Sequence, residues 1–221
     1  QTADNGYLLF GDRTIHKTNM NGNSLWTKEF GGNQGRATEE TNDGYLFCGS
    51  NYISSGNFDI WLEKRDFSGN LLWSITYGSN NSYPFNTDHG YSIKKTHDKG
   101  FIIAGVSSDY TNSASSSIFL VRIDSAGSVL WTKSHEQDNW TLDQYEKDMS
   151  VKETTDSGFI VIVGMKDSVQ SYLEEQSILL KTDQNGTKIW SKRYTGSYVD
   201  VVQTSDKGYA LTGKHNSDLI A

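Results

Sequence analysis

The sequence predicts an all-β fold built from repeated four-stranded segments. Its apolar residues come in short runs of four to six between clusters of Gly, Asn, Asp and Ser, a pattern typical of many short strands. Two sequence markers also recur along the 221 residues, at intervals of roughly 40 to 60 residues, the range in which propeller blades occur. We therefore expect a β-propeller of four-stranded antiparallel blades, with about five blades or as part of a larger propeller.

The first marker is T-x-D-x-G followed by an aromatic residue and an apolar run. Its copies begin at Thr2, Thr41, Thr96, Thr154 and Thr204, and the copy at Thr41 is one residue shorter. We expect a strand a to end at the Thr and a strand b to follow the Gly. In the turn between them, the Asp side chain can bond its own backbone and the Gly can adopt a positive φ.

The second marker is a hairpin, strand c, a tight turn and strand d. Its clearest copy is Asp59 to Gly78, and the others are Thr14 to Gly31, Ser117 to Ser134 and Ser177 to Gly196. A turn glycine lies four residues before a tryptophan in each copy: Gly22, Gly69, Gly127 and Gly186 precede Trp26, Trp73, Trp131 and Trp190. The aspartates of both markers are interpreted as turn-forming residues, because none matches the alternating carboxylates of a calcium loop.

Together the markers divide the chain into repeats. Three are complete, Arg36 to Gly78, Tyr91 to Ser134 and Met149 to Gly196. We expect one propeller domain over residues 1–221, with repeats at about 1–35, 36–90, 91–148, 149–198 and, in part, 199–221. The first repeat lacks most of strand a and the last lacks strand d, which favours a piece of a longer propeller or a longer polypeptide.

The four hairpin tryptophans are expected to pack between neighbouring blades. A blade cannot bury both of its faces alone, and an indole ring removes about 150–250 Å² from water when buried. We predict that Trp131→Ala lowers the free energy of unfolding by about 3–5 kcal/mol.

Composition argues against some functions. The net charge of −7 disfavours binding to nucleic acid or to an anionic membrane surface, since both depend on Lys and Arg. No apolar run approaches the length of a membrane span. The single cysteine, Cys48, excludes an intrachain disulfide and is interpreted as a small buried core residue.

Strand direction predicts where a ligand would bind. The a–b and c–d turns share one end of the sheets, the turn end, and the b–c and d–a connections share the other, the loop end. All long inserts fall at the loop end: residues 51–57, 79–89, 107–116, 135–148 and 166–176. Binding residues concentrate on such loops. Our candidate ligand residues are Trp140, Tyr83, Phe85, Tyr110, Tyr145, Tyr172, Asp138 and Asp143, and the same end carries Tyr52, Tyr198 and Asp88.

Aromatic rings beside carboxylates suit a glycan or a protein partner. The alternative is that these rings only stabilise their own loops. Catalytic motifs are absent from the sequence: the five histidines form no HExxH pattern, and no GxSxG or P-loop motif occurs. The sequence therefore predicts a non-catalytic binding or scaffold module without a cofactor or metal site. The alternatives are a lectin or glycan-active enzyme using the same face, or a spacer without a ligand.

The two markers resemble the propeller-like repeats of large secreted or surface proteins of Bacteroidota and some archaea. Their consensus is similar to T-x-D-G-G-Y-I-x-A-G followed by D-x-W-L-x-K-x-D-x-x-G-N-x-x-W-x-K-x-Y-G-G, and Asn57 to Gly78 is the segment most similar to it. The resemblance covers nearly the whole chain. It implies an extracellular or cell-surface location, export by the type IX route and a partner at the cell surface.

A weaker similarity links the c–d hairpin to the docking hairpin of quinoprotein-type propellers, which ends D-x-x-x-G-x-x-x-W. Here the spacing from Asp66 to Gly69 is one residue shorter, and a single cysteine cannot form the vicinal pair of those dehydrogenases. This similarity therefore implies blade packing and no quinone cofactor.

Overall fold

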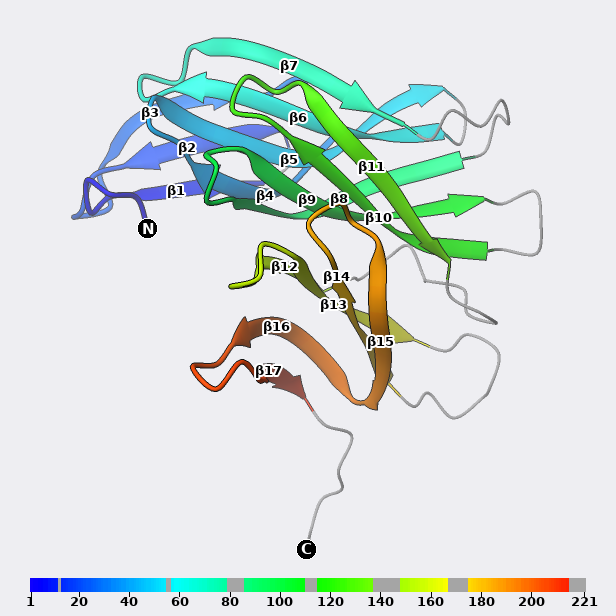
Figure 1. The fold of residues 1–221 in the computed structure, drawn as a ribbon. Coiled ribbons are helices and arrows are strands. Elements are labelled where there is room, and N and C mark those ends of the chain that lie inside the picture. Colours follow the sequence, from blue (N-terminus) through cyan, green and yellow to red (C-terminus); the bar gives the residue numbers. More distant parts are fainter. Residues whose placement is uncertain are drawn as a thin grey trace, which may run out of the picture. The chain divides into compact units, whose positions relative to one another are not determined.

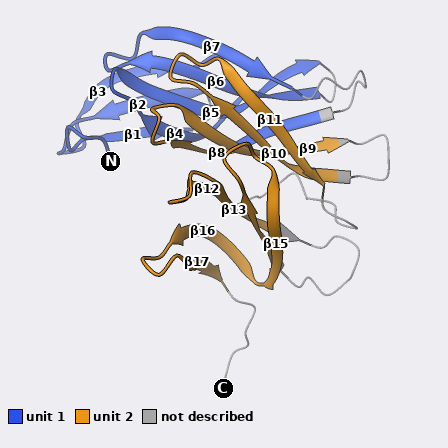
Figure 2. Ribbon diagram, viewed as in Figure 1, with its two compact units in different colours: residues 1–90 blue, residues 91–221 orange. Residues whose placement is uncertain are grey.

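The computed structural model describes residues 1–11, 13–54, 57–78, 86–109, 115–136, 148–166 and 175–214. Every helix or strand in these ranges is a β-strand, so the described part of the chain is all-β, as predicted (Figure 1). The chain divides into two compact units, residues 1–90 and residues 91–221 (Figure 2). We describe the units one at a time, and the single domain expected from the sequence stays a prediction.

Unit 1 contains two groups of antiparallel strands. The first group is a sheet of three strands, β1 (Tyr7–Phe10), β2 (Thr14–Thr18) and β3 (Ser24–Glu29), which correspond to strands b, c and d. The second group has all four strands in the order of the sequence, β4 (Gln34–Glu40), β5 (Gly44–Ser54), β6 (Asn57–Asp66) and β7 (Leu71–Tyr77). The strand order within each group matches the order expected from the two markers.

Strand β8 (Asn86–Lys95) begins in unit 1 and continues into unit 2. Near its start, Thr87 pairs with Phe58 of β6 through a single parallel bridge. Both residues of this bridge belong to unit 1, and the sequence did not predict their pairing.

Unit 2 continues the same pattern. The third group is β8, β9 (Phe101–Asp109), β10 (Ser115–Ile123) and β11 (Val129–Glu136). The fourth group is β12 (Met149–Glu153), β13 (Phe159–Lys166), β14 (Glu175–Thr182) and β15 (Lys188–Thr195), and the fifth is the pair β16 (Ser197–Gln203) and β17 (Tyr209–Lys214).

Several strands extend further towards the loop end than predicted. β5 and β6 pair as far as Ser54 and Asn57, so most of the expected insert 51–57 is part of a hairpin. In the same way, β9 and β10 pair from Asp109 to Ser115, and β8 begins at Asn86 and not at Tyr91. The sequence interpretation ended each strand where apolar residues stopped, whereas ladder hydrogen bonds use the backbone and continue through Ser, Asn and Asp.

The core explains why strand b is an unbroken apolar run. Successive side chains of a strand point to opposite faces. In β13, Phe159, Val161 and Val163 pack in a cluster with β9 and β10 residues such as Ile102 and Leu120. The alternate residues Ile160 and Ile162 pack in a second cluster with Leu179 and Val201. Both faces of the fourth group are therefore covered by neighbouring groups of unit 2.

The turn glycines have two different roles. In the c–d turns they adopt a positive φ, at 79° for Gly22, 79° for Gly69, 93° for Gly127 and 74° for Gly186. For the a–b turns we predicted a positive φ at the glycine. In four of them this is wrong, because the positive φ belongs to the preceding residue, Asn5, Lys99, Ser157 or Lys207. The glycine is needed there for close packing: a Cβ at Gly158 would overlap the carbonyl oxygen of Thr182.

Candidate functional site

The aspartate of the first marker is the centre of a recurring polar network at the turn end. In the fourth group, Asp156 Oδ1 accepts hydrogen bonds from Thr154 Oγ1 at 2.5 Å and from the Gly158 amide at 3.1 Å. Lys181 of β14 donates to the same oxygen at 3.0 Å and to the Thr182 carbonyl at 2.8 Å. The Lys181 side chain is only 5% exposed. Its ammonium group is thus buried but has two partners.

The same ion pair occurs in four groups. Lys17 pairs with Asp4 at 2.8 Å, Lys64 with Asp43 at 2.8 Å and Arg122 with Asp98 at 2.5 Å. Each basic residue pairs across the c–d ladder with the hairpin tryptophan, and a register shift follows it directly. Sequence reasoning missed this pair, although its signal was present: Lys or Arg precedes the first residue of each c–d turn by two positions.

These contacts keep the turn aspartates ionised. Hydrogen bonds from Thr154 and Lys181 lower the pKa of Asp156 to about 2. The pKa of Asp4 is lowered mainly by Lys17, that of Asp43 mainly by Lys64 and that of Asp98 mainly by Thr96. Stably charged carboxylates bound to their own turns act as structural anchors, in agreement with the turn-forming role that the sequence predicted.

Three hairpin tryptophans lie against the next group of strands within their unit. We call this contact a seam. Trp26 lies 6.4 Å from Tyr45, Trp131 lies 5.8 Å from Phe159 and Trp190 lies 5.8 Å from Tyr209, measured between ring centroids. In each case the partner is the aromatic residue after the T-x-D-x-G marker. Trp73 is half-buried and occupies the same register position, opposite Lys64.

Two further contacts recur at the seams. A Cβ at Gly186 would lie 2.6 Å from the Trp131 ring, so the turn glycine of the fourth group also makes room for the tryptophan of the third. A backbone amide in three of the a–b turns also donates to the last residue of the next strand a. These hydrogen bonds are Ala3 to Glu40 at 2.9 Å, His97 to Glu153 at 2.8 Å and Thr155 to Gln203 at 2.9 Å.

The candidate ligand residues chosen from the sequence lie outside the described residues. They are Trp140, Tyr83, Phe85, Tyr110, Tyr145, Tyr172, Asp138 and Asp143. Their assignment to a binding face stays a prediction. Of the other residues expected at the loop end, the structure describes the side chains of Tyr52, Asp88 and Tyr198.

At the loop end of unit 1, three rings form a row across β5, β6 and β8. Tyr52 contacts Phe58 edge to face at 5.5 Å, and Phe58 lies 5.3 Å from the His89 ring. The Tyr52 amide donates to Asn33 Oδ1 at 2.8 Å, which fixes the end of β5. The Tyr52 side chain is nevertheless 48% exposed. A paired strand thus presents an aromatic ring to solvent.

Two carboxylates belong to the same part of unit 1. Asp59 follows Phe58 in β6 and Asp88 precedes His89 in β8, and Asp88 is only 1% exposed. Burial raises the pKa of Asp59, and the negative charge of Asp88 raises it further. We call Tyr52, Phe58, His89, Asp59 and Asp88 the rim cluster. Sequence reasoning placed Tyr52, Asp88 and the insert that contains His89 on this face, but it did not choose His89 as a ligand residue. It missed Phe58 and Asp59, because β6 was expected to belong to the blade interior.

The loop end of unit 2 shows the alternative role of an aromatic residue. Tyr198 contacts Tyr194 at 6.4 Å, and both pack on the core cluster of the fourth and fifth groups. The Tyr198 amide also donates to Ser177 Oγ at 2.8 Å. Tyr198 therefore stabilises its own part of the fold.

Other chemistry has little support among the described residues. No group of three His, Cys, Asp or Glu side chains there could hold a metal ion. Cys48 is fully buried, as predicted, and burial raises the pKa of its thiol to about 12. Within the same ranges, no helix is long and apolar enough to cross a membrane.

Comparison with known proteins finds no family model that matches the chain and no curated protein that is similar to it.

Proposed function

We propose that this chain is an exported β-propeller module that binds a protein or glycan partner at its loop end. The support for a propeller is the repetition of one four-stranded group along the chain, with both faces of the fourth group covered. The tryptophan seams repeat at equivalent positions, as stacked blades require. The resemblance to secreted and surface repeat proteins supports export and a location at the cell surface.

The rim cluster is the observation that carries the binding proposal. Tyr52 is exposed but held by its strand, so little side-chain entropy would be lost when a partner covers it. The half-buried Asp59 carboxylate provides a hydrogen-bond acceptor close to the rings. A flat apolar surface beside acceptors suits the face of a sugar ring or a loop of a partner protein.

Binding is tested with a glycan array and with a photo-crosslinking residue placed at position 52 in cells that export the protein. We expect either specific binding to a glycan on the array or a specific protein crosslinked to position 52. Glycan binding should be lost, or weakened at least tenfold, in Tyr52→Ala. Tyr7→Ala is the matched control, because Tyr7 is also exposed but lies in β1. If no glycan binds and position 52 crosslinks no more than position 7, the proposal is wrong.

A second candidate is a glycan-active enzyme at the same place. The half-buried Asp59 favours it, because burial raises the pKa of its carboxyl group and a raised pKa is what a general acid needs. Hydrolysis of glycans that bind the array, abolished in Asp59→Asn, would support this candidate. Binding without hydrolysis would leave the non-catalytic module.

A further inference from the structure

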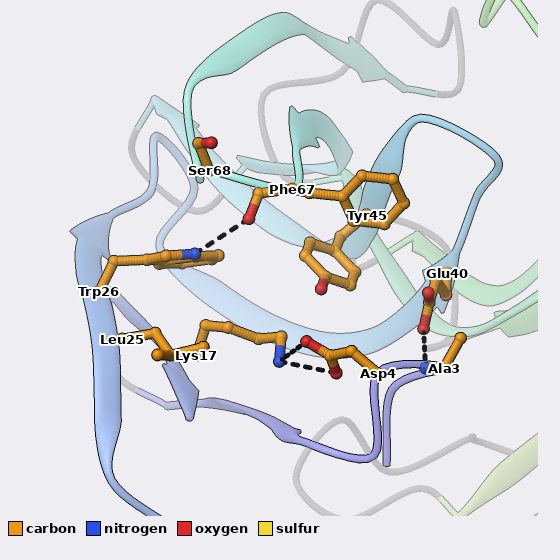
Figure 3. Close-up of a pocket in the computed structure, with 9 residues that line it drawn as sticks. All are labelled: Ala3, Asp4, Lys17, Leu25, Trp26, Glu40, Tyr45, Phe67 and Ser68. Carbon is orange, nitrogen blue, oxygen red and sulfur yellow. Dashed lines mark hydrogen bonds and ion pairs between the residues drawn. The ribbon is translucent and has the colours of Figure 1, made fainter. Parts of the chain in front are cut away.

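A pocket of about 470 Å³ lies at the turn end of unit 1, between the first and second groups. It is separate from the rim cluster, which lies at the loop end. Figure 3 shows that Trp26 and Lys17 come from the first group, while Tyr45, Phe67 and Glu40 come from the second. Asp4 of the first a–b turn also lines the pocket and, with Glu40, provides its two carboxylates.

Three aromatic rings form one side of this pocket, which we call the aromatic pocket. Trp26 lies 6.4 Å from Tyr45, and Tyr45 contacts Phe67 edge to face at 5.4 Å. Trp26 Nε1 donates to the Phe67 carbonyl at 3.0 Å, which fixes the indole relative to the turn. Tyr45 is buried, while Phe67 is 47% exposed. The rings are therefore ordered by the seam, and Phe67 extends them towards solvent.

Phe67 is not explained by the fold. The equivalent position of the other c–d turns is Met20, Ser125 or Gln184, so the turn does not need an aromatic residue. Its backbone carbonyl accepts the indole hydrogen bond whatever the side chain is. An exposed ring at this position instead enlarges the apolar wall of the pocket.

The opposite side of the aromatic pocket carries net negative charge. Lys17 Nζ bonds both oxygens of Asp4, at 3.0 and 2.8 Å, and the Thr18 carbonyl at 2.8 Å, so its charge is compensated. Glu40 accepts the Ala3 amide through Oε2 and adds a second carboxylate. Burial raises the pKa of Tyr45 to about 12, and the charges of Glu40 and Asp4 raise it as well. The field in the pocket thus favours a cation.

We propose that the aromatic pocket binds an organic ammonium group, such as a small quaternary amine or the alkylammonium of a lysine side chain. Cations are attracted to the faces of Trp, Tyr and Phe within about 6 Å of the ring centroid, and apolar walls accommodate the carbon atoms around the nitrogen. Glu40 would supply the compensating charge. An anion is disfavoured by the net charge, and a small inorganic ion would gain nothing from the apolar walls.

The seam between the third and fourth groups provides an internal comparison. It keeps Trp131, Phe159 and Glu153 at the positions of Trp26, Tyr45 and Glu40, but Gln184 replaces Phe67. There the Glu153 carboxylate accepts the His97 amide and also lies 2.8 Å from His97 Nδ1. The aromatic pocket thus differs from its counterpart in two ways. It has a third ring, and among the described contacts Glu40 lacks the imidazole partner that Glu153 has.

Calorimetric titration of the full chain with choline, with butylammonium and with 3,3-dimethylbutanol tests the proposal. The alcohol is a neutral isostere of choline, so it separates charge from shape, while butylammonium separates a lysine-like ligand from a quaternary amine. We expect at least one cation to bind, about tenfold more tightly than the alcohol. Absence of binding by both cations, or equal binding of the alcohol, would overturn the proposal.

Two variants locate the binding without altering the fold. Phe67→Gln introduces the residue found at the same turn position in the fourth group. Glu40→Gln removes the charge but keeps an acceptor for the Ala3 amide, as Gln203 does for Thr155. We expect both variants to unfold at the same temperature as the wild type and to bind the cation at least fivefold more weakly. Unchanged affinity in both would place the cation elsewhere and refute the site.

Discussion

At the scale of single residues, the Thr, Asp and Gly of the first marker recur together along the chain because these three residues bond to one another. Thr154 and Gly158 both donate to Asp156, and Gly158 also lets strand c pass close to the turn. A Cβ at Gly158 would overlap the Thr182 carbonyl and approach Lys181 Nζ. The glycine of the marker is thus a requirement of packing, and the positive φ of 62° belongs to Ser157.

Gly158→Ala should therefore destabilise the protein by about 2–4 kcal/mol, because backbone and not a flexible side chain must move. Urea denaturation followed by fluorescence measures the change. Gly11→Ala is the control, since a Cβ there meets nothing within 4 Å, and it should change the free energy of unfolding by less than about 0.5 kcal/mol. Equal effects of the two substitutions would refute the close approach at Gly158.

The buried ion pair predicts an asymmetry between its partners. Lys181 is buried, whereas the Asp156 side chain is 58% exposed. Asp156→Asn leaves an ammonium group without its counter-charge and should cost about 1–3 kcal/mol. Lys181→Met leaves only a hydrated carboxylate and should cost less than Asp156→Asn. Thermal unfolding of both variants checks the order, and a larger loss for Lys181→Met would contradict this account.

At the scale of elements, the sequence predicted strand identity and order well, because apolar periodicity and turn residues are local signals. The three complete repeats correspond to β4–β7, β8–β11 and β12–β15. Strand ends were predicted less well, since backbone pairing continues where apolar residues stop. The parallel bridge between Phe58 and Thr87 was not predictable, because pairing between strands that are not consecutive leaves no local pattern.

The seam gives a prediction for Trp131. The ring is half-buried and packs against the cluster that contains Phe159. Trp131→Ala should lower the free energy of unfolding by about 2–4 kcal/mol, somewhat less than for a fully buried ring. Leu130→Ala is the control, because Leu130 is next to Trp131 in the sequence but its side chain is 54% exposed. A denaturation midpoint that does not change in Trp131→Ala would show that the seam contributes nothing.

At the scale of the whole molecule, the repeated aspartate network couples stability to pH. The pKa values of Asp4, Asp43, Asp98, Asp156 and Asp206 are all lowered in the folded protein. A lowered carboxyl pKa stabilises the fold above the unfolded value near 4, and this stabilisation is lost as the pH falls through the folded value. For Asp156 the loss extends down to about pH 2.

The free energy of unfolding should therefore decrease steadily as the pH falls from about 5 to 2. Denaturant midpoints at each pH measure the slope. Asp156→Asn removes one titrating group, so its curve should be flatter than that of the wild type over this interval. A wild-type midpoint that stays constant down to pH 2 would contradict the lowered pKa values.

The candidate site was less predictable than the fold. Loop composition identified a face, but its eight candidate residues lie outside the described ranges, and the rim cluster instead includes Phe58, Asp59 and His89 from strands. The aromatic pocket was not anticipated either. Trp26 was interpreted as a packing residue, and the position of Phe67 and Glu40 beside it depends on how two groups meet, which no single segment encodes.

The central claim is that consecutive strand groups within a unit pack through a tryptophan and the aromatic residue of the next strand b. A double-mutant cycle on Trp131→Ala and Phe159→Ala in the full chain tests it most directly. Residues in contact should show a coupling free energy of about 0.5–1.5 kcal/mol. Additive effects of the two substitutions, within about 0.3 kcal/mol, would contradict the seam and with it the stacked arrangement.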